Sequence, residues 1–598
     1  MTMKTRFTTY KADQNGAALL LVMILSAIAL AILAGVMTWG ATSNRLTHRS
    51  IQYTRSIAAA EAATEKVESQ ITRDFLSGGE QLTSLNLNTY RSIVPSSSDS
   101  SYWNNWVFDD GNGNLNQTYV QRIPPGTNYI VLDAPYAGLK GSVTTYMVAS
   151  HASDQASMQD VNGGVLQELE LTGIPIFQFA MYSSGNMEIS CGKNFDVTGP
   201  VHCNGILYIE PDVNYLNFES GVTAVVTNIF SRDTVDGDTR GYPAGNVTYV
   251  HPDENISPVQ ALTLPIGQTN TPEAIRQIIE PPPPGEDAHS ALGLLRYYNQ
   301  CDMILTVSND GATATSGVFD NRKILIPTNE VNLFVTLTNS FWDGREKKYV
   351  QPIDIDIGML TAWAETNLDL CPVLRGGTNT PSGYVMDSIY IVDARTAPVL
   401  PDSNLGAVRV EDGTNLPPNG LTVATGRPLY VWGDYNELNS GYLGTTNTSA
   451  TRPASFAADA ITILSRNWQD SLTVETNAAD TTVNAAFLTG VVDTAPPSSS
   501  LYTGYSGGME NFPRFLEDWS AAISTYNGSM IKMFPSLYAT NPWGGPVEYY
   551  KPPARNWTYD ANFDDPTQLP PHTPQLLKVI VGQWSTLSPG TNLAAAFP

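Results

Sequence analysis

The amino-acid sequence predicts a long N-terminal α-helix followed by a mainly β body. The helix is indicated by an uncharged apolar run over residues 17–39, after which the stretch from Thr42 contains no Pro or Gly until Gly78. The β body is indicated by short runs of alternating apolar and polar residues that end in turns rich in Gly, Asn and Pro. Charged residues make up only 15% of the 598 residues, which is typical of turn-rich β structure rather than helical bundles.

The predicted helix covers residues 17–77, after a leader of residues 1–16. At about 1.5 Å per residue, the apolar run over 17–39 spans roughly the 30 Å hydrocarbon layer of a membrane. Beyond it, apolar residues recur at helical spacing, as expected for an amphipathic continuation. Ser77-Gly78-Gly79 is a plausible helix stop, because glycine readily adopts the left-handed C-terminal conformation.

A short basic leader ends at Gly16, the apolar helix then starts with Ala17-Ala18-Leu19-Leu20-Leu21, and the motif Ala59-Ala60-Glu61-Ala62-Ala63 follows later. These features resemble the N-terminus of type IV minor pilins and pseudopilins of the X and K types. The resemblance implies that prepilin peptidase cuts between Gly16 and Ala17. It also implies other pilins or pseudopilins as partners and a single pass through the inner membrane, with the N-terminus cytoplasmic and the body outside, at a pilus or the cell surface.

One position departs from the pilin pattern. Major pilins carry Glu at the fifth mature position, where this chain has Leu21. By the same resemblance, that Glu pairs with a neighbouring subunit's terminal amine, so its absence puts ordinary polymerisation in doubt and favours a place at a filament tip. The alternative interpretation of the N-terminus is a plain signal anchor that is never processed.

The rest of the chain divides into three regions that differ in composition and in the pattern of apolar residues. Residues 78–165 are a mixture of strands and loops, residues 166–495 form a β-rich body with an insertion at about 251–400, and residues 496–598 are aromatic and Pro-rich. Short strands at 179–226 and 407–492 cannot each bury an apolar face alone, so we expect them to stack in one continuous β-solenoid. Since no fixed repeat period is visible, β-sandwich domains are the alternative.

Parts of the body resemble blocks in large uncharacterised envelope proteins of planctomycete- and verrucomicrobium-type bacteria, which carry the same pilin-type N-terminus. The segments that carry this resemblance are residues 433–436, 459–465, 507–517 and 569–574. The resemblance implies no known activity.

The charge distribution excludes one class of ligand. The net charge is −25, and within the first 60 residues Asp13 is the only acidic residue among several basic ones. The body is therefore strongly acidic and repels nucleic-acid phosphates, so DNA and RNA are not expected partners.

The chain has four cysteines, too few for a disulfide framework in a protein of this length. Cys191 and Cys203 flank a single turn-like stretch. An oxidising compartment allows them to pair as a disulfide, and two free buried thiols are the alternative.

Gly504-Tyr505-Ser506-Gly507-Gly508 satisfies the Gly-x-Ser-x-Gly pattern of hydrolase nucleophile elbows. Chain order also allows Asp518 or Asp560 as the acid and His572 as the base. An elbow needs a buried strand before it and a helix after it, however, and here a Pro- and Ser-rich stretch precedes the motif. We therefore predict that Ser506 is structural.

Several polar residues are weak candidates for a metal site. Residues 110–114 alternate like the start of a calcium loop, but Leu115 occupies the position that needs glycine, so a solvated turn fits better. The acidic turn at 233–238 is a second weak Ca²⁺ candidate. His202 beside Cys203 lacks the spacing of a zinc site. We predict no cofactor and no metal site.

Asp354 and Asp356 would share one face of a strand, as paired carboxylates of a polysaccharide-degrading enzyme could, but an ordinary half-exposed strand has the same pattern. Together the observations predict a non-enzymatic structural or adhesive surface protein, with surface polysaccharide as a candidate partner. The alternative function is an exported serine hydrolase or polysaccharide-degrading enzyme on a β-solenoid.

Overall fold

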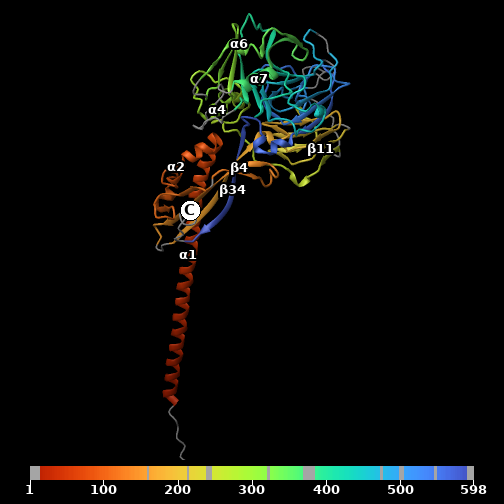
Figure 1. Cartoon of the computed structure of the whole chain (residues 1–598). Coiled ribbons are helices and arrows are strands. Elements are labelled where there is room, and N and C mark those ends of the chain that lie inside the picture. Colours follow the sequence, from red (N-terminus) through yellow and green to blue (C-terminus); the bar gives the residue numbers. More distant parts are fainter. Residues whose placement is uncertain are drawn as a thin grey trace, which may run out of the picture.

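A computed structural model shows a long helix that carries a large, mainly β region at one end (Figure 1). It describes residues 14–124, 126–157, 161–211, 214–236, 246–319, 323–367, 384–471, 476–496, 504–543 and 549–588. Helix α1 spans Gln14–Leu85, and its N-terminal half extends away from the rest of the molecule. The predicted order of a long N-terminal helix and a mainly β body is confirmed.

Helix α1 is irregular at Gly78-Gly79, where the sequence predicts its end. Gly79 has a φ of +66°, a conformation that glycine adopts without steric cost. The helix resumes after the two glycines and ends at Leu85 instead of Ser77, followed by α2 (Leu87–Arg91). The glycine pair therefore acts as a kink rather than a stop.

The second half of α1 packs on a six-stranded antiparallel sheet. Its strands are β1 (Trp106–Asp109), β2 (Tyr119–Arg122), β3 (Asn128–Val131), β4 (Lys140–Asp154), β5 (Asn162–Pro175) and β34 (Gln575–Leu587). Val67, Ile71 and Phe75 of α1 are buried against Val148 and Leu169 of the sheet. The helix and the antiparallel sheet thus share one apolar core, which we call the helix–sheet unit.

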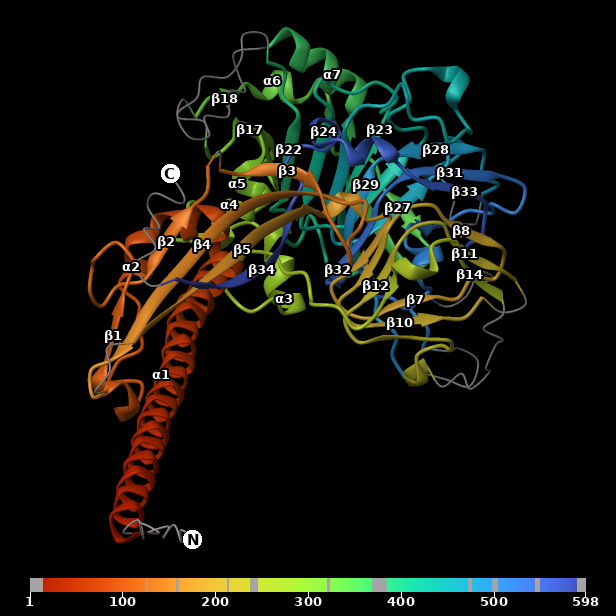
Figure 2. The same ribbon diagram turned by 90° about the horizontal axis from the view of Figure 1, so that it is seen from below.

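The remaining chain is inserted between two neighbouring strands of this sheet. β34 pairs antiparallel with β5, with Gln575 opposite Pro175 (Figure 2). The boundary predicted at residue 165 lies inside β5, and the predicted C-terminal region supplies β34. The body therefore leaves and rejoins the helix–sheet unit at the same end of two paired strands.

A twelve-stranded sheet runs through the body. In spatial order its strands are β15 (Asn255–Ile256), β12 (Val222–Ala224), β9 (Val201–Cys203), β6 (Met181–Ser183), β32 (Met530–Pro535), β29 (Ala486–Val491), β26 (Ala454–Ala458), β24 (Leu421–Thr425), β22 (Ser388–Asp393), β16 (Met303–Ser308), β17 (Gly311–Ser316) and β18 (Leu325–Ile326). Pairing is parallel from β15 to β16 and antiparallel beyond β16.

Smaller sheets form the other sides of the body. Two three-stranded parallel sheets contain β7 (Met187–Ile189), β10 (Ile206–Ile209) and β13 (Thr227–Ile229), and β8 (Phe195–Val197), β11 (Leu216–Phe218) and β14 (Val247–Tyr249). A seven-stranded sheet contains β19 (Val335–Thr336), β20 (Phe341–Asp343), β21 (Lys348–Asp356), β23 (Asn404–Glu411), β25 (Leu429–Trp432), β27 (Ile461–Leu464) and β30 (Arg514–Phe515). A third three-stranded sheet contains β28 (Thr481–Asn484), β31 (Ile523–Gly528) and β33 (Ala554–Tyr559).

Successive turns of the chain pair in register. Met181 of β6 is opposite Val201 of β9, which is opposite Val222 of β12. At the other side of β6, Met181 is opposite Met530 of β32. Strand β32, which follows β24, β26 and β29 in the sheet, therefore pairs with β6, the first strand of the run β6, β9 and β12. In this way the segments 179–226 and 407–492 contribute to one twelve-stranded sheet.

The predicted insertion at about 251–400 contributes to the same sheets and also covers them. It supplies β16 and β22 to the twelve-stranded sheet and β21 to the seven-stranded sheet. It also contains the short helices α3 (Pro272–Arg276), α4 (Ala291–Leu295), α5 (Tyr297–Gln300), α6 (Thr328–Val331) and α7 (Ile357–Thr366). Ile275 and Ile278 pack on side chains from the twelve-stranded sheet, such as Leu488 and Ile531. Consequently the central strands of that sheet, such as β24 and β26, are buried on both faces, and simple apolar–polar alternation fails there.

Candidate functional site

The first half of α1 exposes apolar side chains around its whole circumference. Between Leu19 and Trp39 the large hydrophobic side chains are 48–73% exposed. In the part of the chain that the structure describes, this is the one helix long and apolar enough to cross a membrane. An exposed apolar surface of this extent marks a region that lipid or other protein covers.

The predicted processing residues lie at the start of this apolar segment. Gly16 and Ala17 both fall within α1, which begins at Gln14. Leu21, where major pilins carry a glutamate, is 60% exposed. Arg45 and Arg49 follow the apolar run, so a cut after Gly16 would leave an uncharged helical segment followed by a basic one.

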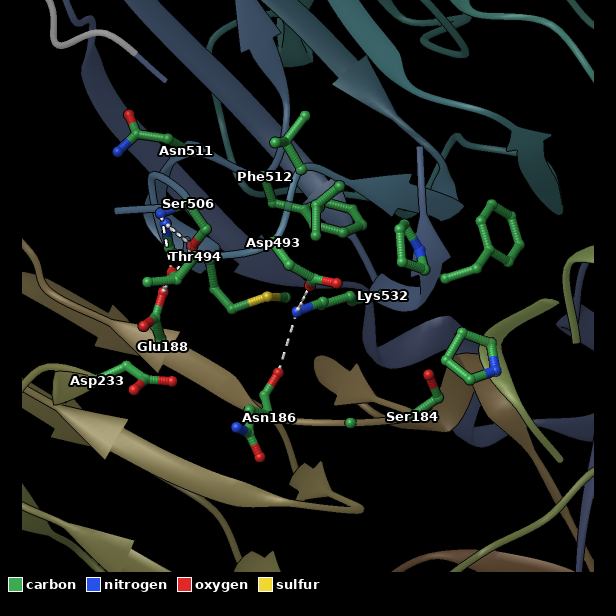
Figure 3. A pocket seen from close by; sticks show the side chains of 18 of the residues that line it. Ser184, Asn186, Glu188, Asp233, Asp493, Thr494, Ser506, Asn511, Phe512 and Lys532 are labelled. Carbon is green, nitrogen blue, oxygen red and sulfur yellow. Dashed lines mark hydrogen bonds and ion pairs between the residues drawn. The ribbon is translucent and has the colours of Figure 1, made fainter. Parts of the chain in front are cut away.

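Ser506 lies in a cavity of about 290 Å³ in the body, together with Glu188 and Thr494 (Figure 3). The Ser506 hydroxyl donates to Glu188 Oε2 at 2.7 Å and accepts from the Gly508 N–H at 3.2 Å. The Thr494 hydroxyl donates to the same glutamate oxygen. Glu188 is on β7, whereas Thr494 and Ser506 come from the segment after β29.

The other members of the predicted serine triad lie elsewhere. His572 Nε2 is 2.8 Å from Ser388 Oγ, and His572 lines a different cavity from Ser506. Asp518 is held in an ion pair with a lysine, whose hydrogen bond lowers the pKa of Asp518 to about 2. Asp560 caps a short 3₁₀ helix. The structure therefore places a carboxylate beside Ser506, and it does not bring His572, Asp518 or Asp560 to it.

Glu188 is the cavity residue that sequence reasoning missed. Met187-Glu188-Ile189 reads as an ordinary alternating strand, with Glu188 on the solvent side. In the structure Glu188 is only 8% exposed, because the segment carrying Ser506 covers it. Burial raises the pKa of Glu188, while the hydroxyl hydrogen bonds lower it and the nearby Asp233 carboxylate raises it further. The sequence feature that pointed to this site was the Gly-x-Ser-x-Gly motif around Ser506. The motif did not indicate which carboxylate would contact Ser506.

Cys191 and Cys203 are both buried, and the structure does not join them to each other. Cys203 Sγ donates to the Gly185 carbonyl at 3.1 Å, and burial raises the pKa of this thiol to about 11. Cys203 ends β9 in the twelve-stranded sheet, whereas Cys191 follows β7 in a different sheet. The turn between them therefore does not place the two sulfurs in a cross-strand pair. Cys371 is outside the described residues.

His202 belongs to the core. Its Nδ1 is 2.8 Å from the Thr223 hydroxyl, its Nε2 is 2.9 Å from Asn204 Oδ1, and its ring stacks on Tyr182. Burial lowers the pKa of His202 to about 4. Among the residues that the structure describes, no group of three or more His, Cys, Asp and Glu side chains could hold a metal ion.

The remaining carboxylate candidates have structural partners. Asp110 Oδ1 accepts from the backbone N–H groups of Asn112 and Asn114, as expected of a closed turn. Asp354 is paired with Arg409 at 2.7 Å, and both side chains are fully buried. Asp356 Oδ1 accepts from a backbone N–H in the first turn of α7. Asp233 lines the Ser506 cavity, whereas the acidic turn that follows it extends beyond the described residues.

No family model and no characterised protein matches the chain. Among solved structures, the chain is similar to the competence-associated pilin ComZ from Thermus thermophilus, with 11% sequence identity, 90% of this chain and 97% of that chain covered, and a TM-score of 0.25. A TM-score of this size does not establish a shared fold.

Proposed function

We propose that this chain is a pilin-like surface protein, anchored in the inner membrane or held in a filament by the first half of α1. The observation that carries the proposal is the exposed apolar run from Leu19 to Trp39, which has no cover within the described chain. At about 1.5 Å per residue this run is long enough to cross a hydrocarbon layer of about 30 Å.

The helix–sheet unit supports the same interpretation. The Ala59–Ala63 motif lies at the helix–sheet contact, where Ala59, Ala60 and Ala63 pack with Ala152 and Val165. Small side chains allow the helix to approach the sheet closely. The motif that resembles pilins therefore joins the anchoring helix to its sheet, so that the helix and the attached sheet form one continuous support for the body.

We further propose that the body is a β-solenoid that displays its loops away from the anchor. The parallel, in-register pairing of Met181, Val201 and Val222 supports stacked chain turns rather than the antiparallel sheets of a β-sandwich. A structural or adhesive role follows, since the inserted body can vary its loops without changing the helix–sheet unit.

Mass spectrometry of the protein purified from membranes tests the pilin-type anchor. We expect a mature N-terminus at Ala17 and retention of the protein in the membrane fraction after alkaline carbonate extraction. The matched variant Gly16→Leu should keep the uncut N-terminus and the same membrane retention. An intact Met1 in the wild type would leave a plain signal anchor, and a cut near Ala41 would contradict anchoring altogether.

The rival function is an exported serine hydrolase that uses Ser506. One observation favours it, because the Ser506 hydroxyl donates to a buried carboxylate in a cavity. We propose instead that Ser506 is structural, since its hydroxyl also accepts from the Gly508 N–H and so closes the local turn. Fluorophosphonate should fail to label the protein. Labelling that disappears in Ser506→Ala would establish the hydrolase.

A further inference from the structure

The cavity beside Ser506 has an unused acceptor on its wall. Glu188 Oε2 accepts from both the Ser506 and the Thr494 hydroxyls, whereas Glu188 Oε1 is buried and has no hydrogen-bond partner in the described chain. Leaving a buried carboxylate oxygen without a donor is unfavourable, because the oxygen has lost its hydration without gaining a hydrogen bond. A ligand that offers a donor at this position would remove that cost.

Other charged side chains line the cavity that contains Glu188. Asp233 lines the same cavity and lies close enough to Glu188 to affect its ionisation. Lys532 contacts Asp493 Oδ1 at 2.7 Å and the Asn186 carbonyl at 3.2 Å. An ammonium group has three donors, so one N–H of Lys532 remains beyond these two contacts within the described residues.

The charge on the cavity wall selects the class of ligand. The wall carries the carboxylates of Glu188, Asp233 and Asp493 and the cationic groups of Lys532, Arg345 and Arg514, of which Arg514 is paired with Glu346. An inorganic anion would meet the carboxylates, and a free metal ion would meet the cationic groups. A neutral molecule with several hydroxyl groups can bind both the carboxylates and the cationic groups, because each hydroxyl can donate and accept a hydrogen bond.

We propose that this cavity binds a single saccharide unit, whose hydroxyl groups donate to Glu188 Oε1 and Asp233 and accept from Lys532 Nζ. A volume of about 290 Å³ is close to the lower end of known ligand sites, about 300–1,000 Å³, and suits one sugar ring. Phe512 and Met509 supply apolar wall for the C–H face of the ring. Asn186 lines the cavity and is exposed, so the cavity is reached from the surface of the body.

The test titrates full-length protein in detergent micelles with glucose, galactose, mannose and N-acetylglucosamine, each followed by saturation-transfer NMR and calorimetry. We expect at least one of these sugars to bind. Glu188→Gln should weaken that binding about tenfold or more. The amide oxygen would keep accepting from Ser506 and Thr494 in place of Oε2, so the NH₂ group would stand where Oε1 accepts from the ligand hydroxyl. Glu219→Gln, an exposed site outside the cavity with the same change in charge, should bind like the wild type.

Circular dichroism checks that each variant is folded. If Glu188→Gln does not fold, the sugar affinity of Asp233→Asn tests the proposal instead. Asp233 lies in a surface turn, and the oxygen of an asparagine can still accept from the Val235 N–H. Absence of binding by all four sugars would overturn the proposal. So would wild-type affinity in both cavity variants, or a response to calcium chloride or sodium phosphate instead of a sugar. These results do not depend on cleavage at Gly16, so they leave the anchor proposal to its own test.

Discussion

The helix–sheet unit and the body hold their charged side chains in different ways. In the helix–sheet unit the ion pairs of lysine and arginine are at least partly exposed: Lys66 and Asp99 are each 38% exposed, Arg55 is 50% exposed beside Asp154, and Arg122 is 33% exposed beside Glu80. In the body, Arg409 and Asp354 are both 0% exposed at 2.7 Å. The first region is therefore joined mainly by apolar packing, whereas the second also contains dry ion pairs.

The cause of this difference is the pairing of strands in the body. Asp354 on β21 and Arg409 on β23 are directly opposite each other in a parallel ladder, and further layers of chain cover both. Arg409 also reaches Asp470 at 2.6 Å and lies over the Trp432 ring. A charge buried in this way must be neutralised where it lies, because water cannot solvate it. Antiparallel sheets with a solvated face have no such requirement.

The largest effect is expected from Arg409→Ala. The substitution removes the charged partner of the buried Asp354 carboxylate and leaves only the Asn339 side-chain amide donating to it. We therefore expect the free energy of unfolding of the body to fall by about 3–5 kcal/mol. Urea denaturation with hydrogen-exchange mass spectrometry would measure this and localise it. The double variant Arg409→Met, Asp354→Leu should recover much of the loss. A loss below about 1 kcal/mol for Arg409→Ala would mean that the pair behaves like a surface pair.

A second prediction concerns the apolar core of the helix–sheet unit. Ile71→Ala should lower its stability by about 2–5 kcal/mol, because Ile71 is fully buried between α1 and the sheet. Hydrogen exchange in β4 and β5 should rise while exchange in β24 and β26 stays unchanged. Leu46→Ala, at a residue 63% exposed, is the control and should change neither. Equal loss of protection in the body would show that the two regions unfold as one.

A third prediction uses pH. The pKa of His202 is about 4 in the folded body, below the unfolded value of about 6.5, so the unfolded chain binds more protons between these values. The His202 contribution to stability is complete above about pH 6.5 and is lost as the pH falls toward 4, by about 3 kcal/mol. The pKa of Glu510 is raised by burial to about 7, which acts in the opposite direction. The difference in pH dependence between the wild type and His202→Gln therefore isolates the histidine, and identical profiles would contradict the prediction.

The smallest effect is expected at the surface of the helix–sheet unit. Arg55→Ala removes a solvent-exposed ion pair with Asp154, whose closest atoms are 3.7 Å apart. We expect a loss of no more than about 1 kcal/mol, which should vanish in 1 M salt because exposed charges are screened. Thermal unfolding at low and high salt measures it. A loss comparable to that of Arg409→Ala would remove the contrast between the two regions.

The sequence by itself determined the features that depend on near neighbours. The apolar run over 17–39 and the helical spacing that follows it predict α1, and the short runs around 187–197 and 421–423 predict strands. The kink at Gly78-Gly79 was also marked, although its effect was a bend rather than an end. Such signals are readable because helix and strand periodicity is set within a few residues.

Only the tertiary structure decided which distant segments meet. The pairing of Gln575 with Pro175 makes the body an insertion in the antiparallel sheet, and the pairing of Met530 with Met181 joins two series of parallel strands. The meeting of Glu188 with Ser506 creates the cavity in the same way. Each contact joins residues hundreds of positions apart, so no local pattern encodes it. It forms because apolar strand faces and strand edges must be covered, and many segments with similar local patterns could have covered them.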